Sequence, residues 1–204
     1  MLRKTMVALA LVLVPSLMAV EARLLRHPTY HKGKVAFSYL GDIWTAHEDG
    51  TAPQRLTVHR ARDVYPRFSP DGRWIAFSSN RDGNYDVFVM PAAGGTPRQL
   101  TFHTGGDNVV GWTPDSRHVI FSAARGQGPF GSVANLYHVA VEGGLERRIE
   151  TDWGYSGSYS PDGSKLAFNR HSPTWWRKHY RGRDRKSTRL NSSHIQKSRM
   201  PSSA

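Results

Sequence analysis

The sequence predicts an all-β protein made of short antiparallel strands, and two observations support this fold class. The 204 residues include 19 Gly and 12 Pro, and most of these stand between short apolar runs, which indicates many tight turns. The second observation is an internal repeat, in which Pro70, Pro114 and Pro161 occupy the same place in three similar segments. A hydrophobic content of 38% with 22% charged residues is typical of a folded globular chain.

The first half of the repeat predicts two strands joined by a turn. Residues 65–77 read YPRFSPDGRWIAF, residues 110–121 read VGWTPDSRHVIF and residues 157–168 read GSYSPDGSKLAF. Residues 31–37, HKGKVAF, form a degenerate first copy without the Ser-Pro-Asp-Gly turn. In such a turn Ser accepts a hydrogen bond from the backbone, Pro fixes φ near about −65°, and Gly takes a positive φ. In one copy Ser116 replaces the glycine.

The second half of the repeat predicts two more strands. Each copy continues with an apolar run, a Gly-containing turn and a short polar strand, and the apolar runs are residues 41–46, 84–90 and 135–140. The Gly-Gly pairs at 94–95 and 143–144 suit tight hairpins. Four short strands in each period of about 40 to 50 residues are typical of a β-propeller blade.

The expected fold is therefore a partial β-propeller of four-stranded antiparallel blades, with three blades and the start of a fourth in residues 23–183. Segments 74–77 and 86–90 are apolar on both faces, as strands packed between two neighbouring blades require. A β-sandwich, the competing all-β fold, does not account for a repeat this regular.

The N-terminus predicts export. Arg3 and Lys4 precede an almost wholly apolar run at residues 6–20, and Ala22 ends a plausible cleavage site, which is the layout of a secretory signal peptide. Residues 1–22 are therefore expected to be a signal peptide and the mature chain to be periplasmic or secreted. An uncleaved N-terminal anchor is the alternative, although the run is short and is interrupted by Pro15.

Charge and cysteine content exclude several function classes. The net charge is +12 at pH 7, but basic and acidic residues are mixed along the chain, so no nucleic-acid partner is expected. The absence of Cys excludes disulfides, thiolate catalysis and cysteine-based zinc sites. No membrane contact beyond the signal peptide is expected.

Three motifs suggest chemistry that their context opposes. Residues 126–131 (GQGPFG) fit G-x-G-x-x-G, but without a strand–helix unit they predict a flexible loop between strands of the third blade. Residues 154–157 (GYSG) lack the spacing and helix of a nucleophile elbow and lead into an innermost strand. Residues 175–180 (WWRKHY) can stack on bases or bind an acidic peptide end, but packing under the next blade is the favoured interpretation.

Four recurring polar residues are candidates for a site. His59 and His103 occupy the same repeat position, so both could face the channel and share a ligand. A structural role in their loops is the favoured interpretation, because no carboxylate stands at ligand spacing. Asp42 and Asp86 also recur and are expected to make a hydrogen bond that stabilises each blade. The sequence accordingly predicts no catalytic residue, no cofactor and no metal site.

The repeat resembles the short propeller motif of the periplasmic Tol-Pal propeller protein and of the tricorn proteases. Residues 24–28, 35–44, 107–115 and 175–182 are similar to the propeller of tricorn-type serine proteases, and the resemblance covers residues 24–183. It implies the propeller portion of an extracytoplasmic serine peptidase, truncated before its catalytic domains and carrying no catalytic residues. The implied role is to bind peptides or unfolded polypeptides in the channel and to control their access to the missing C-terminal protease domains.

Two other interpretations stay open. A stand-alone periplasmic propeller would act as a protein-binding module, as the likeness to the Tol-Pal propeller implies. The propeller of a prolyl-oligopeptidase relative would instead precede an α/β-hydrolase domain. These three interpretations differ in the natural sequence beyond residue 183 and not in the residues before it.

Residues 184–204 (DRKSTRLNSSHIQKSRMPSSA) stand apart from the repeat. They contain few apolar residues and resemble the translation of a sequencing-library adapter. We expect this tail to be non-native and disordered.

Overall fold

The computed structural model describes residues 24–128, 131–151 and 154–170. The predicted signal peptide, the aromatic segment at 175–180 and the tail at 184–204 lie outside the described residues, so these three interpretations stay predictions. Within the described ranges, no helix is long and apolar enough to span a membrane.

The described chain consists of three four-stranded antiparallel sheets and a hairpin, and the strands of each sheet pair in chain order. The first sheet contains β1 (Arg26–His31), β2 (Lys34–Tyr39), β3 (Asp42–His47) and β4 (Gln54–Arg55). The second contains β5 (Asp63–Phe68), β6 (Trp74–Ser79), β7 (Asp86–Pro91) and β8 (Arg98–Gln99). The third contains β9 (Asp107–Trp112), β10 (His118–Gly128), β11 (Gly131–Ala140) and β12 (Arg147–Arg148), and the hairpin pairs β13 (Gly154–Tyr159) with β14 (Leu166–Arg170). This confirms the predicted partial β-propeller.

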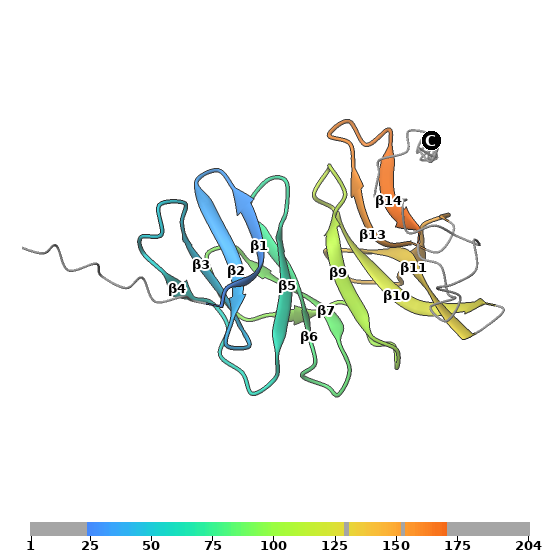
Figure 1. Cartoon of the computed structure of the whole chain (residues 1–204), viewed down its shortest axis with the longest axis horizontal. Helices are drawn as coiled ribbons and strands as arrows, with labels where there is room; N and C mark the ends of the chain where they lie inside the picture. Colours follow the sequence, from blue (N-terminus) through green and yellow to red (C-terminus); the bar gives the residue numbers. More distant parts are fainter. Residues whose placement is uncertain (1–23, 129–130, 152–153, 171–204) are drawn as a thin grey trace, which may run out of the picture.

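The first strand of each blade lies on the inner side of the arc. β1 packs against β5, β5 against β9, and β9 against β13, whereas the fourth strand of each sheet pairs only at the opposite edge. In Figure 1 the blades follow one another from β4 at one side of the molecule to β14 at the other.

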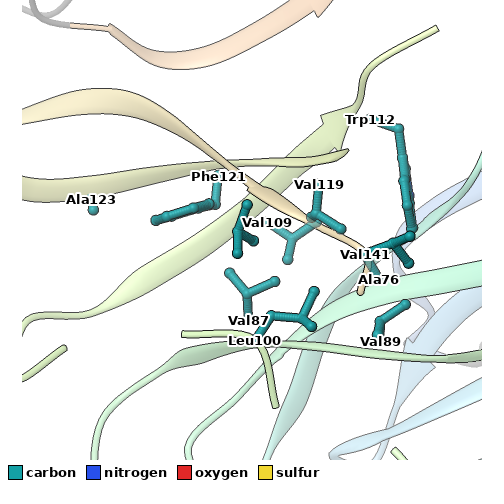
Figure 2. Close-up of a cluster of buried hydrophobic side chains, with 11 residues drawn as sticks. Ala76, Val87, Val89, Leu100, Val109, Trp112, Val119, Phe121, Ala123 and Val141 are labelled. Carbon is teal, nitrogen blue, oxygen red and sulfur yellow. The ribbon is translucent and has the colours of Figure 1, made fainter. Parts of the chain in front are cut away.

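Apolar side chains fill the space between adjacent sheets. Val87 and Leu100 of the second blade face Val109 and Phe121 of the third (Figure 2). Similar clusters join the first blade to the second and the third blade to the hairpin. Strands β6 and β7 are buried on both faces except at Trp74 and Pro91, as predicted for strands between two blades, and each fully buried large side chain contributes about 1.5–3 kcal/mol.

The Ser-Pro-Asp-Gly turn forms as predicted. Ser69 Oγ accepts the N–H of Trp74 at 3.0 Å and donates to Asp71 Oδ1 at 2.6 Å. Gly72 has a φ of +75°, and a Cβ there would lie 2.3 Å from Nε2 of His31. The positive φ of the turn favours glycine at this position, and a larger side chain there would also require the His31 ring to move.

The turn recurs in the next blade and in the hairpin. Thr113 Oγ1 accepts the N–H of His118, and Ser160 Oγ accepts that of Lys165, both at 3.0 Å. Ser116 adopts the positive φ of the glycine it replaces, +62°. Its hydroxyl also accepts a hydrogen bond from the Asp71 N–H at 3.1 Å. The serine at this position thus links the turns of two blades.

Residues 126–128 and 131 lie in strands and not in the loop that the sequence predicts, and residues 129–130 lie outside the described residues. β10 continues to Gly128 and β11 begins at Gly131, and the backbone register pairs Gly126 with Val133 and Gln127 with Ser132. The β10–β11 pairing is interrupted by a register shift between Ala123 and Gly126 and then continues past Ala123, where the pairing of β10 with β9 ends. Extended pairing occurs because the two-stranded ladder satisfies backbone N–H and C=O groups internally.

Candidate binding site at the inner strands

The inner strands carry side chains that the sheets do not bury. Exposed and half-buried residues alternate along β1, and Tyr30 in this strand is 60% exposed. In β13, which includes the GYSG motif, Tyr155 is also exposed. Since β6 and β7 are buried between blades, the inner face is a surface of the arc where a ligand can reach aromatic and polar groups.

A hollow of about 400 Å³ lies where the inner strands meet the Ser-Pro-Asp-Gly turns. Aromatic rings and prolines form much of its wall, together with serine hydroxyls and one arginine, and neither Asp nor Glu is among the lining residues. All three blades and the hairpin contribute: the hollow is lined by Tyr30, His31, Arg67, Phe68, Ser69, Pro70, Gly111, Trp112, Pro114, Ser158, Tyr159, Ser160 and Pro161.

Arg67 is a half-buried cation in the wall of this hollow. Its Nε donates to the Val110 carbonyl at 3.0 Å and its Nη1 to the Pro66 carbonyl at 3.0 Å. The indole Nε1 of Trp112 donates to the carbonyl of Arg67 at 2.9 Å. The third blade therefore fixes both the backbone and the side chain of this arginine. Burial lowers the pKa of the Arg67 guanidinium.

Positive charge gathers on the inner face. Its two carboxylates, Asp63 and Asp107, are fully buried and paired with arginines. Neither Arg26 nor Arg67 forms an ion pair with a carboxylate in the described part of the chain. The pKa of His27 is lowered, first by burial and then by the charges of Arg67 and Arg26. This face is suited to an anionic group.

The two candidate histidines act in their own loops. His59 Nδ1 accepts the N–H of Ala61 at 3.0 Å, and His103 Nδ1 accepts the N–H of Gly105 at 2.8 Å. Each ring closes the same short turn after the fourth strand of its blade, which confirms the structural interpretation. Neither histidine lines the hollow.

The recurring aspartates stabilise blades as predicted. Asp42 accepts hydrogen bonds from Arg55 Nη2 at 2.5 Å and from Thr57 Oγ1 at 3.4 Å. Asp86 accepts one from Thr101 Oγ1 at 3.3 Å, and Gln99 takes the place that arginine has in the first blade, with Nε2 at 3.3 Å. These bonds join the third strand of a blade to its fourth.

Sequence reasoning missed a second recurring arrangement, here named the Asp–Arg clasp. Arg81 Nη2 donates to Asp63 Oδ2 at 2.8 Å, and Arg125 Nη2 donates to Asp107 Oδ2 at 2.6 Å. Each guanidinium also lies 5.0–5.6 Å from the centres of two aromatic rings of its own blade, Phe77 and Phe88 or Phe121 and Tyr137. Both members of the clasp recur after 44 residues, so the repeat step itself was the signal that could have found it.

Within the described ranges, no group of three or more His, Asp and Glu side chains could hold a metal ion. There too, the hydrogen bonds of serine hydroxyls go to carboxylates, carbonyls, N–H groups and an arginine rather than to a histidine ring. A serine nucleophile needs a base within hydrogen-bond reach. The described inner face offers a ligand aromatic surface and a fixed cation.

Blades of this topology, joined through their inner strands, define the class of the protein as a β-propeller. The chain belongs to the family of the tricorn protease N-terminal β-propeller domain, whose family model matches residues 22–202.

Shorter stretches of the chain match individual relatives. A 70-residue stretch is 40% identical to Tricorn protease homolog 1 of Streptomyces coelicolor, covering 34% of this chain and 7% of that protein. A 49-residue stretch is 45% identical to the TolB homolog of Chlorobium luteolum, covering 24% of this chain and 11% of that protein. The crystal structure of the tricorn protease superposes with a TM-score of 0.61 at 22% identity, over 72% of this chain and 15% of that one, and this likeness concerns the fold alone. The matched stretches span a small part of the length of these relatives.

Proposed function

We propose that this chain is the propeller part of an extracytoplasmic tricorn-like serine peptidase, and that its inner face binds peptides and controls their access to a protease core outside this chain. The observation that carries the proposal is the hollow at the turn end of the inner strands. It is the place where aromatic, hydroxyl and cationic groups of all three blades and the hairpin converge.

The shape and composition of the hollow support a peptide as its ligand. About 400 Å³ accommodates a few amino-acid residues. Aromatic and proline walls offer apolar area to peptide side chains, and the hydroxyl and guanidinium groups offer polar contacts. The extracytoplasmic location in this proposal rests on the export pattern of residues 1–22.

A second candidate is a protein-binding module that docks another envelope protein. The similarity to the TolB homolog over 49 residues favours it. The gene beyond residue 183 distinguishes the two: a protease core supports the first candidate, and a stop codon soon after the remaining blades supports the second.

Peptide binding is tested with a substitution that fills the hollow. Gly111 lines it, and within 4 Å a Cβ there would meet only the Gly157 carbonyl, at 3.9 Å. The strand therefore has room for the Cβ of Gly111→Phe, and we expect its ring to occupy the ligand space. Leu145→Phe is the matched control, because Leu145 is 91% exposed and does not line the hollow.

The measurement is fluorescence anisotropy of labelled random hexapeptides with the full chain. We expect the Gly111→Phe variant to lose binding at least tenfold, an effect of about 1.4 kcal/mol, and the Leu145→Phe variant to bind as the unaltered chain does. Equal binding by all three proteins would refute a peptide site in the hollow.

A further inference from the structure

The hollow contains one cation whose hydrogen-bond donors are only partly used. A guanidinium carries five N–H donors. Nε and Nη1 of Arg67 each donate to a backbone carbonyl, and Nη2 has no partner in the described part of the chain. A half-buried charge without a counter-charge is costly, and a carboxylate is the partner whose geometry matches the guanidinium fork.

Three of the hydroxyl groups that line the hollow are already engaged. The Tyr30 hydroxyl donates to Glu48 Oε2 at 2.9 Å and accepts the N–H of Gly33 at 3.0 Å. Ser69 Oγ and Ser160 Oγ are held inside their turns. The guanidinium of Arg67 therefore offers an entering anion donors that are both charged and unused.

The wall beside Arg67 is apolar. Phe68 and Trp112 stand next to it, and prolines of three successive turns, Pro70, Pro114 and Pro161, complete the rim. Burial raises the pKa of the Tyr159 hydroxyl, so this ring is neutral at physiological pH. A ligand that fits both parts of the wall combines a negative group with an apolar body.

We propose that Arg67 forms a carboxylate-binding subsite of the hollow, which takes a carboxylate attached to an apolar group. The bonds from Arg67 to the Val110 and Pro66 carbonyls, and from Trp112 to the Arg67 carbonyl, hold the guanidinium in place before the ligand arrives. Such preorganisation reduces the ordering that binding costs. In a peptide, the carboxylate is either the C-terminus or an Asp or Glu side chain. This last step rests on the proposed peptide-binding function.

The subsite itself is tested with a small carboxylate probe and its uncharged amide analogue. Isothermal titration calorimetry of the full chain compares 4-phenylbutyrate with 4-phenylbutyramide. We expect the carboxylate to bind at least about tenfold more tightly, because hydrogen bonds to charged groups are the strong ones. Arg67→Met should abolish that preference, and Arg67→Lys should retain part of it.

The matched control removes the same charge elsewhere on the inner face. Arg26 lies on β1, is exposed and does not line the hollow, so Arg26→Met should reduce the preference by less than about threefold through the general field alone. If Arg67→Met does not fold, Arg67→Lys and the probe pair on the unaltered chain decide the question. Equal affinity for the two probes in the unaltered chain, or an equal loss in Arg26→Met and Arg67→Met, would overturn the subsite.

Peptides then identify the source of the carboxylate. Three apolar hexapeptides are compared: one with a free C-terminus, one amidated, and one amidated with a single internal Glu. A preference for the first assigns the subsite to a C-terminus, and a preference for the third assigns it to an acidic side chain. Equal binding of all three, lost in Gly111→Phe, would keep the peptide function and refute the subsite. A probe preference without peptide binding would keep the subsite and refute the function.

Discussion

In the second and third blades the Asp–Arg clasp holds the inner strand, and the first blade lacks this clasp. In the second blade, β6 and β7 are joined by residues 80–85, and this turn carries Arg81 to Asp63. In the third blade, β10 itself extends far enough for Arg125 to reach Asp107. In the first blade, β2 and β3 are joined by Leu40 and Gly41 alone, so the turn has no residue that could form the clasp.

This difference between the blades separates the contacts that the backbone alone makes from those that need a longer turn or strand. Leu40 and Gly41 have φ values of +51° and +90°, as a tight two-residue hairpin turn requires. The Gly41 carbonyl accepts the N–H of Asp63 at 2.7 Å, just as the Tyr85 carbonyl accepts that of Asp107 at 2.6 Å. The blade-to-blade backbone contact is thus kept in both cases, and the clasp is added where the turn or strand is longer.

The largest expected effect comes from breaking the third-blade clasp. Arg125 is 9% exposed and pairs with both Asp107 and Glu146. Arg125→Met would leave the fully buried Asp107 unpaired, which we expect to cost about 3–5 kcal/mol of unfolding free energy. Arg81→Met should cost less, because Arg81 is 16% exposed and pairs with one carboxylate. Urea unfolding of the full chain measures both.

The control for this prediction is Arg73→Met. The Arg73 side chain is 76% exposed in its ion pair with Asp71, and exposed pairs contribute about 0–1 kcal/mol. A loss in Arg125→Met no larger than in Arg73→Met would contradict the structural importance of the clasp.

A smaller effect is expected from giving Asp86 of the second blade an arginine partner like the one that Asp42 has in the first blade. Burial, followed by the nearby carboxylate of Asp107, raises the pKa of Asp86 to about 6, from an ordinary value of 3.8. Between about pH 4 and pH 6 the folded chain therefore holds a proton that the unfolded chain has lost. Asp86 thus makes the unfolding free energy fall as pH rises from about 4 to about 6, and its contribution is constant above that.

Gln99→Arg gives Asp86 the partner that Arg55 provides for Asp42. We expect a gain of about 1 kcal/mol at pH 7.5 and none at pH 4, because a nearby cation favours the charged carboxylate. Denaturant unfolding at pH 4, 5, 6 and 7.5 measures the difference in unfolding free energy between the variant and the unaltered chain. His27 and His138, whose pKa values are lowered, titrate in both proteins, so their contributions cancel in this difference. In the third blade Asn135 of β11 accepts a hydrogen bond from Arg148 at 3.0 Å, as Asp42 does from Arg55 in the first. Asp86→Asn, which places this residue type in the second blade, should remove the same pH dependence. A Gln99→Arg gain independent of pH would contradict the assigned origin.

The smallest effect is expected at the tight turn of the first blade. Leu40 is 83% exposed with a φ of +51°, a conformation that leucine adopts at a cost and asparagine tolerates. Leu40→Asn should raise the unfolding free energy by about 0.5–1 kcal/mol. Val58→Asn, at a side chain that is 76% exposed, is the control and should change it by less than about 0.5 kcal/mol. Calorimetric melting of the three proteins decides, and an equal shift in both variants would contradict a conformational origin.

Local patterns were enough to predict the fold. The residues of the turn from Ser69 to Gly72 are determined by the backbone conformation of that turn. The runs that are apolar on both faces are determined by the blades that pack on either side. Both patterns were therefore visible in the sequence. The roles of Asp42, Asp86, His59 and His103 were also predictable, because each bond is local to one blade and recurs with it.

The hollow could not be predicted in the same way. In the sequence nothing distinguishes Arg67 from the other basic residues. Its position in the hollow is fixed by hydrogen bonds with Val110 and Trp112, which are more than 40 residues away. The long β10–β11 hairpin was mispredicted because its glycines are typical of loops, whereas pairing across the hairpin satisfies their backbone groups.

The central claim is that ligands bind the inner face at the turn end of the blades, and hydrogen exchange of the full chain tests it most directly. With a bound hexapeptide, amides in residues 66–70, 110–114 and 157–161 should exchange several-fold more slowly, since bound ligands suppress local opening. Amides in the outer segments 54–58 and 98–102 should be unaffected. Protection confined to those outer segments, or none at the inner strands while the peptide is bound, would contradict the account.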